Sequence, residues 1–345
     1  MWRKPTHFEL AHLAQAPPPL AKPGQRGHSV CVETAFTRLV GCSRPLQQAA
    51  MGAVATPELA GAVARAGGLG MLCQFAVEPS PVRIGRVLTL AGDGAVGMGF
   101  FGQWLDDDLA TFEEAASALR VVEVFWTAPA QSVVDRARAC GDALVAWQVG
   151  SVADALGAED VGCDFVVAQG VEAGGHVRGT LGRTELLDAV LARVSLPVVV
   201  AGGIATASDV SAALSAGAAA VRVGTAFVVT EESGGHPSYV QALLHARSGE
   251  DTVLTTAFGL GWPNAPHRVL ACAVAAAQAC QSDTVGEAGP AHARRPVPRF
   301  AVDSPGRDMT GRIEAMALYA GMGVGQCNRL LPAGELVEQL TRDVS

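Results

Sequence analysis

The sequence predicts an α/β fold: a (β/α)8 TIM barrel with a C-terminal helical excursion covering the barrel mouth. Eight short apolar runs recur along the 345-residue chain, and their starts lie roughly 20 to 33 residues apart. The runs are apolar on both faces, as buried parallel strands are, and a helix-sized segment follows each one. A doubly wound open sheet is the alternative fold that this pattern leaves open. The eight runs are residues 45–49, 68–73, 95–100, 121–126, 143–149, 164–170, 197–203 and 220–225.

Local signals place helices between these runs. Thr56, Pro57 and Glu58 form a helix start, with a capping hydroxyl, a proline at the first helical position and an early acid. Other segments carry an N-cap residue, an apolar stripe at helical spacing or a closing glycine. Further helices are expected from Ser151 and over residues 184–194 and 209–216.

Three parts of the chain are distinguished by composition. Residues 1–34 are interrupted by proline and glycine and are expected to be an N-terminal extension. Residues 35–256 form the predicted barrel core, and residues 257–345 are expected to be a helical and loop segment that completes the domain. The region 231–311 is interpreted as helices plus an excursion that covers the barrel mouth or mediates contacts.

Composition argues against several classes of partner. The net charge is −8, and the chain lacks the basic run that would neutralise nucleic-acid phosphates. No apolar run reaches the ~18 residues that span a bilayer, and the N-terminus lacks the apolar segment of a secretory signal. The eight cysteines match no zinc-ligand spacing and are expected to be reduced, mostly buried thiols. We therefore expect a cytoplasmic protein that binds no nucleic acid, membrane or metal, and we interpret the acidic run 106–108 as helix-dipole compensation.

Two strand-to-helix turns predict a phosphate site. The seventh apolar run ends in Gly202 and Gly203, and the eighth ends in Gly224 and Thr225. Glycine lets backbone N–H groups approach an anion closely, and a helix N-terminus adds a positive dipole end. In barrels, the loops after strands seven and eight commonly form a phosphate site. We therefore expect these two turns to bind a phosphate group together.

A histidine follows the sixth apolar run on a glycine-rich loop. His176 would thus lie at the carboxyl end of a barrel strand, and its ordinary pKa near neutrality suits it to proton transfer. His236 also follows two glycines, but a helical pattern begins directly after it, so we interpret it as a helix-entry residue. Glu172 is a candidate general base, but an exposed loop acid is the favoured interpretation.

Four segments in order resemble the nitronate monooxygenase family, formerly called 2-nitropropane dioxygenases. They are RPLQQAAMGAVATPELAGAVARAGGLGML, AQGVEAGGH, PVVVAGGIA and VRVGTAFVVTEESGGHP, and YAGMGVG near residue 319 continues the resemblance. The resemblance implies an FMN-binding TIM barrel. It also implies a monooxygenase that uses O2 to oxidise nitronates or nitroalkanes to a carbonyl compound and nitrite.

The resemblance also implies roles for individual residues. His176 would be the catalytic histidine, either a base toward a neutral nitroalkane or a hydrogen-bond donor to an anionic nitronate. Gln169 would lie beside the flavin, and the phosphate would be held at the two glycine turns. The implied cofactor contacts are Ala50, Met51, Gly52, Gln169, Gly174, Gly175, Ala201, Gly202, Gly203, Gly224 and Thr225.

On the substrate side the sequence departs from the family pattern. Gly99 stands where members often carry asparagine, and Met322 stands where they often carry glutamine. The fourth apolar run ends in Phe125 and Trp126 rather than in a more polar motif. These four positions predict a bulkier and more apolar substrate pocket.

Two other functions remain open from the sequence. Flavin-dependent NAD(P)H enoyl-thioester reductases of fatty-acid, polyketide or other secondary-metabolite biosynthesis share the AGGH and AGGIA motifs. A non-catalytic flavin-binding protein is the third possibility. We expect a small-molecule substrate and O2 as partners, and the sequence leaves the use of NAD(P)H and a homodimer open.

Overall fold

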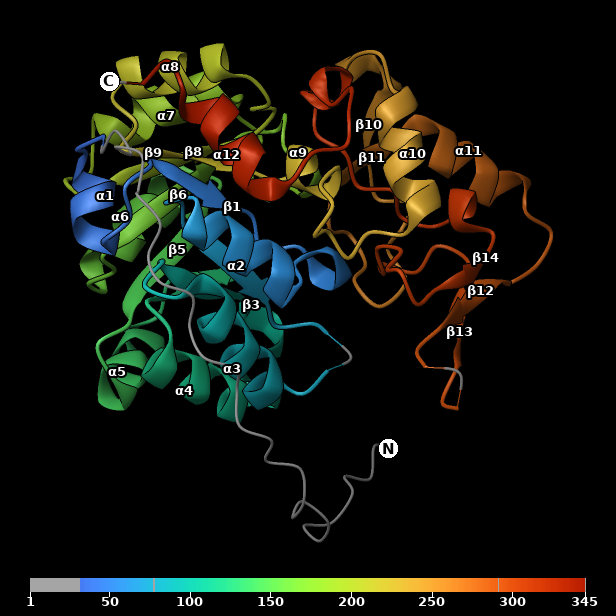
Figure 1. Ribbon diagram of the computed structural model, residues 1–345, viewed down its shortest axis with the longest axis horizontal. Coiled ribbons are helices and arrows are strands. Elements are labelled where there is room, and N and C mark those ends of the chain that lie inside the picture. Colours follow the sequence, from blue (N-terminus) through green and yellow to red (C-terminus); the bar gives the residue numbers. More distant parts are fainter. Residues whose placement is uncertain (1–31, 77, 291, 345) are drawn as a thin grey trace, which may run out of the picture. The chain divides into compact units, whose positions relative to one another are not determined.

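The computed structural model describes residues 32–76, 78–290 and 292–344, and within them eight parallel strands form a closed barrel (Figure 1). The strand order is β1-β9-β8-β6-β5-β4-β3-β2. A bridge between Gln47 and Leu69 joins the two outer strands of that order, which confirms the predicted barrel over an open sheet. Residues 1–31 of the expected extension lie outside the described residues. The strands are β1 (Leu46–Gln48), β2 (Gly70–Cys73), β3 (Val96–Phe101), β4 (Val121–Phe125), β5 (Leu144–Val149), β6 (Phe165–Gln169), β8 (Val198–Ala201) and β9 (Ala220–Val223).

Helices cover the outside of the barrel, and several begin where the sequence predicts. Thr56 and Ser151 each accept a hydrogen bond from a backbone N–H three residues later, at 3.1 Å in both cases. Thr206 and Asp209 cap each other reciprocally at the start of another helix. These helices are α2 (Pro57–Arg65), α3 (Ser80–Ala91), α4 (Leu109–Ala118), α5 (Gln131–Cys140), α6 (Val152–Asp160), α7 (Arg183–Leu191), α8 (Ala207–Ser215) and α12 (Ala333–Thr341).

The interior of the barrel has an apolar layer and a polar layer. At the amino-terminal end, helix α1 (Ala35–Val40) inserts Phe36, whose ring meets that of Phe165 edge-on at 5.5 Å. Deeper inside, Arg222 pairs with Glu123, and both side chains are buried. Gln47 donates to the same carboxylate at 2.9 Å, so the buried pair is also hydrogen-bonded.

The C-terminal segment is more strand-rich than the sequence predicts. The expected helices are present, but two small antiparallel sheets accompany them, in the orders β10-β11-β7 and β13-β12-β14. Strands of two to five residues are too short to show an alternating pattern, so periodicity did not reveal them. The elements are β7 (Gly175–His176), α9 (Thr225–Val228), α10 (Pro237–His245), β10 (Thr252–Thr255), β11 (His267–Leu270), α11 (Ala271–Ala279), β12 (Thr284–Ala288), β13 (Arg295–Pro298) and β14 (Thr310–Gly311). Short 3-10 turns occur at Gly52–Val54, Gly102–Trp104, Asp106–Asp108, Gly249–Asp251, Ile313–Ala315 and Val324–Gln326.

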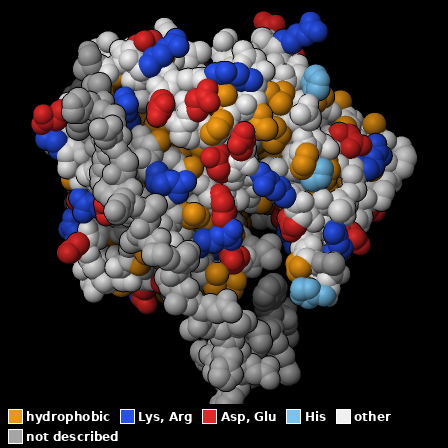
Figure 2. All heavy atoms as spheres, viewed as in Figure 1, with side chains coloured by type: hydrophobic (Ala, Val, Ile, Leu, Met, Phe, Trp, Pro, Cys, Tyr) orange, Lys and Arg blue, Asp and Glu red, His pale blue; other side chains and the backbone are white. Residues whose placement is uncertain are grey.

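Figure 2 shows basic and acidic side chains interspersed over one face of the protein. Among the described residues, no helix combines the length and the apolar character that crossing a membrane requires.

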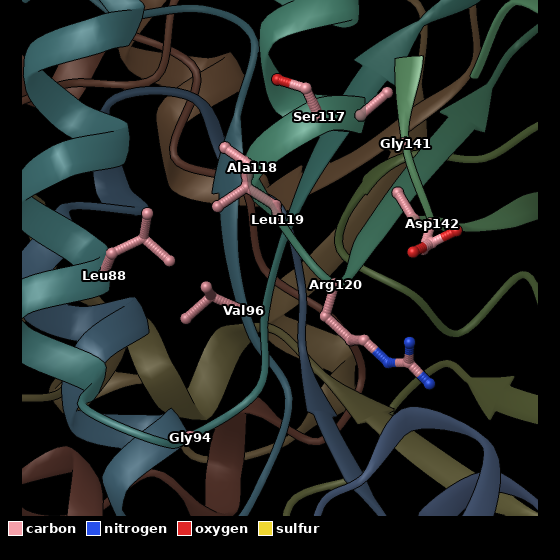
Figure 3. Close-up of a pocket in the computed structure, with 11 residues that line it drawn as sticks. Leu88, Gly94, Val96, Ser117, Ala118, Leu119, Arg120, Gly141 and Asp142 are labelled. Carbon is pink, nitrogen blue, oxygen red and sulfur yellow. The ribbon is translucent and has the colours of Figure 1, made fainter. Parts of the chain in front are cut away.

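A hollow of about 420 Å³ lies at the amino-terminal ends of β3, β4 and β5 (Figure 3). Gly94, Val96 and Asp142 contribute to its lining, together with Arg120, whose guanidinium donates to the carbonyl oxygens of Leu39 and Val40. Barrel enzymes carry their chemistry at the opposite, carboxyl end of the strands. We therefore assign this hollow to the structural end of the barrel.

Candidate functional site

His176 lies at the carboxyl end of the barrel, as the sequence predicts. The amide of Gln169, the last residue of β6, donates from Nε2 to the carbonyl oxygen of His176 at 3.1 Å. On the other side, His176 is paired with His267 in the antiparallel ladder between β7 and β11. The connecting loop packs tightly, since a Cβ at Gly174 would come within 2.6 Å of the backbone nitrogen of Gly321. The loop therefore presents the imidazole in a defined position.

The environment of His176 keeps its imidazole neutral. Burial and the nearby His267 lower the pKa of His176 to about 3. Among the described residues, its Nε2 is buried without a hydrogen-bond partner, and the same holds for Oε1 of Gln169. Two unpaired polar atoms at the same end of the barrel are what a site awaiting a ligand would show. A neutral imidazole with a free Nε2 can accept a proton or donate one.

His267 organises the loop that faces His176. Its Nε2 accepts from the backbone N–H of Phe258 at 3.2 Å, and its Nδ1 lies 2.9 Å from the carbonyl oxygen of Ala265. This pair of contacts requires the neutral Nδ1–H tautomer, and burial accordingly lowers the pKa of His267. Both ends of the loop 256–266 are thus tied to one buried ring.

Six aromatic side chains form a continuous wall beside His176, which we call the aromatic wall. Trp262, from the loop 256–266, stacks on the imidazole with ring centroids 3.8 Å apart and planes 22° apart. Phe125 and Trp126, which are predicted to line a substrate pocket, belong to the wall, and the ring of Trp126 lies 4.8 Å from that of Trp262. The members are Phe75, Phe101, Trp104, Phe125, Trp126 and Trp262.

The predicted phosphate turns converge with a third glycine turn. Gly202 and Gly203 have φ angles of +123° and +66°, which favour glycine, and they follow β8. Thr225, after β9, accepts at its Oγ1 from the backbone N–H of Gly321 at 2.9 Å. A Cβ at Gly323 would come within 2.5 Å of the carbonyl oxygen of Gly203. The turns after β8 and β9 therefore both pack against residues 321–323.

Glu172 differs from its predicted role as an exposed loop acid. Its side chain is half-buried, and both carboxylate oxygens accept from the backbone N–H of Arg183, at 3.0 and 2.8 Å. That N–H is the first of helix α7, so the carboxylate compensates the positive end of the helix. The Arg183 guanidinium in turn donates to the carbonyl oxygen of Gly202 at 2.9 Å. Glu172 thus helps to position the Gly202–Gly203 turn through Arg183.

The segment after β1 lies between the two parts of the site. A Cβ at Gly99 would come within 2.6 Å of the Ala50 side chain, and one at Gly224 would lie 3.7 Å from the Met51 sulfur. Gly52 follows in the same segment, 3.2 Å by the same measure from the Ser304 hydroxyl. The absence of a side chain at Gly99 therefore accommodates the Ala50 side chain.

Met322 and Ala201 lie on the phosphate side. The backbone N–H of Met322 donates to the carbonyl oxygen of Glu172 at 2.9 Å, and the side chain is 43% exposed. Ala201 ends β8 and is paired with Gln169 in the ladder. The contacts of Met322 thus give no support to its predicted place in the substrate pocket, whereas Ala201 lies beside the turn it is expected to help form.

Sequence reasoning missed four members of the aromatic wall and the role of His267. Trp262 lies in WPNAP, a segment interpreted only as a break in the strand rhythm. One usable signal was the scarcity of aromatic residues, which make up 5% of the chain with only five tryptophans, because a rare side chain in a proline-rich loop is a candidate for a site.

Comparisons with known proteins agree with this geometry. The family model described as nitronate monooxygenase matches residues 33–80 and 110–343. A nitronate monooxygenase from Pseudomonas aeruginosa is 31% identical over 365 residues, covering 90% of this chain and 98% of that protein. The (3aS,4S,5R,7aS)-5-hydroxy-7a-methyl-1-oxo-octahydro-1H-indene-4-carboxyl-CoA dehydrogenase from Rhodococcus jostii is 35% identical over 241 residues, covering 69% of this chain and 66% of that protein.

A solved structure shares the fold. FabK from Thermotoga maritima superimposes with a TM-score of 0.73 at 27% identity, covering 90% of this chain and 96% of that chain. The family model covers most of the chain, and the Pseudomonas aeruginosa relative is matched over nearly its full length. The chain therefore belongs to the nitronate monooxygenase family of flavin-dependent oxidoreductases.

Proposed function

We propose that the protein is an FMN-dependent oxidoreductase that oxidises a nitronate or nitroalkane with O2 to a carbonyl compound and nitrite. One observation carries the proposal: a neutral, half-buried His176 presents a buried, unpartnered Nε2 at the barrel end where the glycine turns lie. The Pseudomonas aeruginosa relative, 98% of whose length this chain matches, is a nitronate monooxygenase.

The residues present fit FMN. The turns at Gly202, Gly203 and Gly224 offer backbone without side chains, as a phosphate group requires, and Thr225 lies beside them. Gln169 offers an unpaired acceptor to a donor of the cofactor or the substrate. When bound, FMN supplies the electron acceptor, and O2 takes up the electrons. The cofactor would be held by these residues together with Ala50, Met51, Gly52, Gly174, Gly175 and Ala201.

His176 would handle the proton. A carbon acid such as a nitroalkane loses a proton from the carbon next to the nitro group, and the neutral Nε2 can accept that proton. With a nitronate, which has already lost this proton, the Nε2–H tautomer instead donates a hydrogen bond to an oxygen of the anion. Burial disfavours a lone imidazolium, so the protonated form persists only while the anion lies against it. Proton uptake by His176 is thereby coupled to substrate ionisation.

A specific observation favours a second candidate, an NAD(P)H-dependent enoyl-thioester reductase. The Rhodococcus jostii relative is a dehydrogenase named for a carboxyl-CoA thioester, and it matches 69% of this chain. The apolar wall at Phe125 and Trp126 suits such a substrate as well as it suits a large nitro compound. The two candidates differ in the source and the destination of the electrons.

The purified, coloured protein separates the candidates. Released cofactor is identified by chromatography, and O2 consumption is recorded with nitroalkanes and with their preformed nitronates. Under argon, NADPH should leave the visible flavin band unchanged, whereas a reductase would bleach it at once. Rapid bleaching, turnover of an enoyl thioester and no O2 consumption with any nitro compound would replace the first candidate by the second.

Variants of two matched histidines test the role of His176. His176→Asn should lower kcat/KM by about 10²- to 10⁴-fold, the usual worth of general acid–base catalysis. His236→Asn is the control because His236 also follows two glycines but caps helix α10, where asparagine caps equally well. Unchanged turnover in His176→Asn would refute the assignment and would favour a non-catalytic role for this histidine.

A further inference from the structure

Trp262 is the residue around which the aromatic wall is organised. Its ring lies 5.2 Å from that of Phe101, 4.9 Å from Trp104 and 4.8 Å from Trp126, with interplanar angles of 78° to 86°. Only against His176 does it lie parallel, at 3.8 Å. Three rings therefore fix the orientation of the indole edge-on, and its flat face is directed at the proton-handling side chain.

The chain holds Trp262 in this position from its own loop. Trp262 is 6% exposed, although its neighbour in the same loop, Leu260, is 54% exposed. His267 ties both ends of the loop, through the N–H of Phe258 and the carbonyl oxygen of Ala265. The loop thus buries a tryptophan against His176 and leaves a leucine in solvent, although leucine is fully buried more often than tryptophan in folded proteins.

Trp126 reaches the same corner by means of a strained backbone. Its φ angle is +69°, a left-handed conformation that is a true outlier for a bulky residue. Strain of this kind persists only where surrounding contacts hold it, and here those contacts are the rings of Phe125, His176 and Trp262. The two indoles form a corner beside the imidazole, and we call it the Trp126–Trp262 corner.

The surroundings of this corner suit an uncharged group. Arg178, two residues after His176, is already paired with Asp154 at 3.1 Å and donates to the carbonyl oxygen of Thr127 at 2.6 Å. Its charge is therefore committed to the protein. At the outer edge of the wall, Phe75 stacks on Phe101 and is 44% exposed, so the aromatic surface continues to solvent. A flat apolar group could approach along it.

We propose that the Trp126–Trp262 corner selects substrates whose reacting carbon carries a flat, uncharged, aromatic or unsaturated group, with Trp262 as the specificity-determining residue. Because a face of Trp262 already lies against His176, such a group would meet the indoles edge-on, an arrangement that aromatic rings prefer and that a puckered ring of equal size cannot adopt. The inference rests on the proposed function in one respect: the substrate must bind beside His176.

Equilibrium binding to the flavin-bound protein tests the corner without turnover. Benzamide and cyclohexanecarboxamide are uncharged and similar in size, but only benzamide is flat. Calorimetry should find benzamide bound about 3- to 10-fold more tightly, the worth of one ring-on-ring contact. Trp262→Leu should abolish the difference, and Trp262→Phe should retain most of it. Leu260→Ala, in the same loop, is the control and should leave it unchanged.

A turnover arm uses phenylnitromethane and (nitromethyl)cyclohexane. The ratio of their kcat/KM values should fall in Trp262→Leu by the same factor as the binding ratio, because the intrinsic acidities of the two compounds cancel between variants. Where Trp262→Leu does not fold, as judged by circular dichroism, Trp126→Leu replaces it with the same expected loss. Equal binding of the two amides, or a ratio unaffected by both leucine variants, would overturn the proposal. Selective amide binding without oxidation of either nitro compound would support the corner and refute the proposed reaction.

Discussion

Because folding keeps His176 neutral, the protein should lose stability as the pH falls. The pKa of this histidine is about 3 in the folded protein and about 6.5 in the unfolded chain. Between these values the unfolded chain binds a proton that the folded protein does not, so lowering the pH favours unfolding. The two pKa values correspond to a loss of about 2 kcal/mol between pH 8 and pH 5, and about 3 kcal/mol by pH 4.

Urea unfolding at each half pH step from 8 to 4, on the wild type and on His176→Asn, measures this contribution. Other groups titrate in both proteins, His236 and His267 among them, so the difference between the two curves isolates His176. The free energy of unfolding of the wild type, relative to that of His176→Asn, should fall steadily below pH 6.5, because asparagine takes up no proton. A difference that stays constant from pH 8 to pH 4 would show that His176 titrates normally, and the neutral, desolvated imidazole on which the mechanism depends would have to be abandoned.

Two further perturbations address the barrel and the cofactor turns. Arg222→Met leaves the Glu123 carboxylate buried without its partner and should lower the free energy of unfolding by about 3–5 kcal/mol in urea titrations, whereas adding Glu123→Leu should recover part of that loss. A double variant as unstable as the single one would argue against an uncompensated charge. Gly202→Ala forces a side chain onto a φ angle of +123° beside the phosphate turn and should weaken FMN retention during gel filtration. Gly92→Ala, with φ +60° and open space around the added carbon, should strain the backbone similarly and leave FMN bound.

The barrel could be predicted because its signals are local. A buried parallel strand is apolar on both faces, and seven of the eight runs contain an observed barrel strand, while β3 extends one residue beyond the run 95–100. The helices after Thr56 and Ser151 could be predicted because the hydroxyl of each residue accepts a hydrogen bond from a nearby backbone N–H. The two small antiparallel sheets carry no such signal, because β7 and β14 have two residues each and exist only through their partners.

The site was predictable on one side and hidden on the other. The glycine turns follow strands in sequence, so their place at the carboxyl end of the barrel could be inferred from order alone. The aromatic wall draws Phe75, Trp104 and Trp262 from loops far apart in the chain, and no spacing relates them. Gly99 is a related case: the sequence shows only that a side chain is absent there, whereas the fold shows that the Ala50 side chain lies where a Cβ at Gly99 would be.

The short ladder between β7 and β11 joins two parts of the chain on which the candidate site depends. The barrel carries the glycine turns, whereas Trp262 comes from a segment that follows the last barrel strand in sequence. They meet where His176 faces His267 across the ladder. Substitutions within residues 256–266 would then change the substrate range without altering the glycine turns proposed to bind the cofactor. One constraint applies to such substitutions. The replaced loop must still lead into β11 in register with β7, so that residue 267 lies opposite His176.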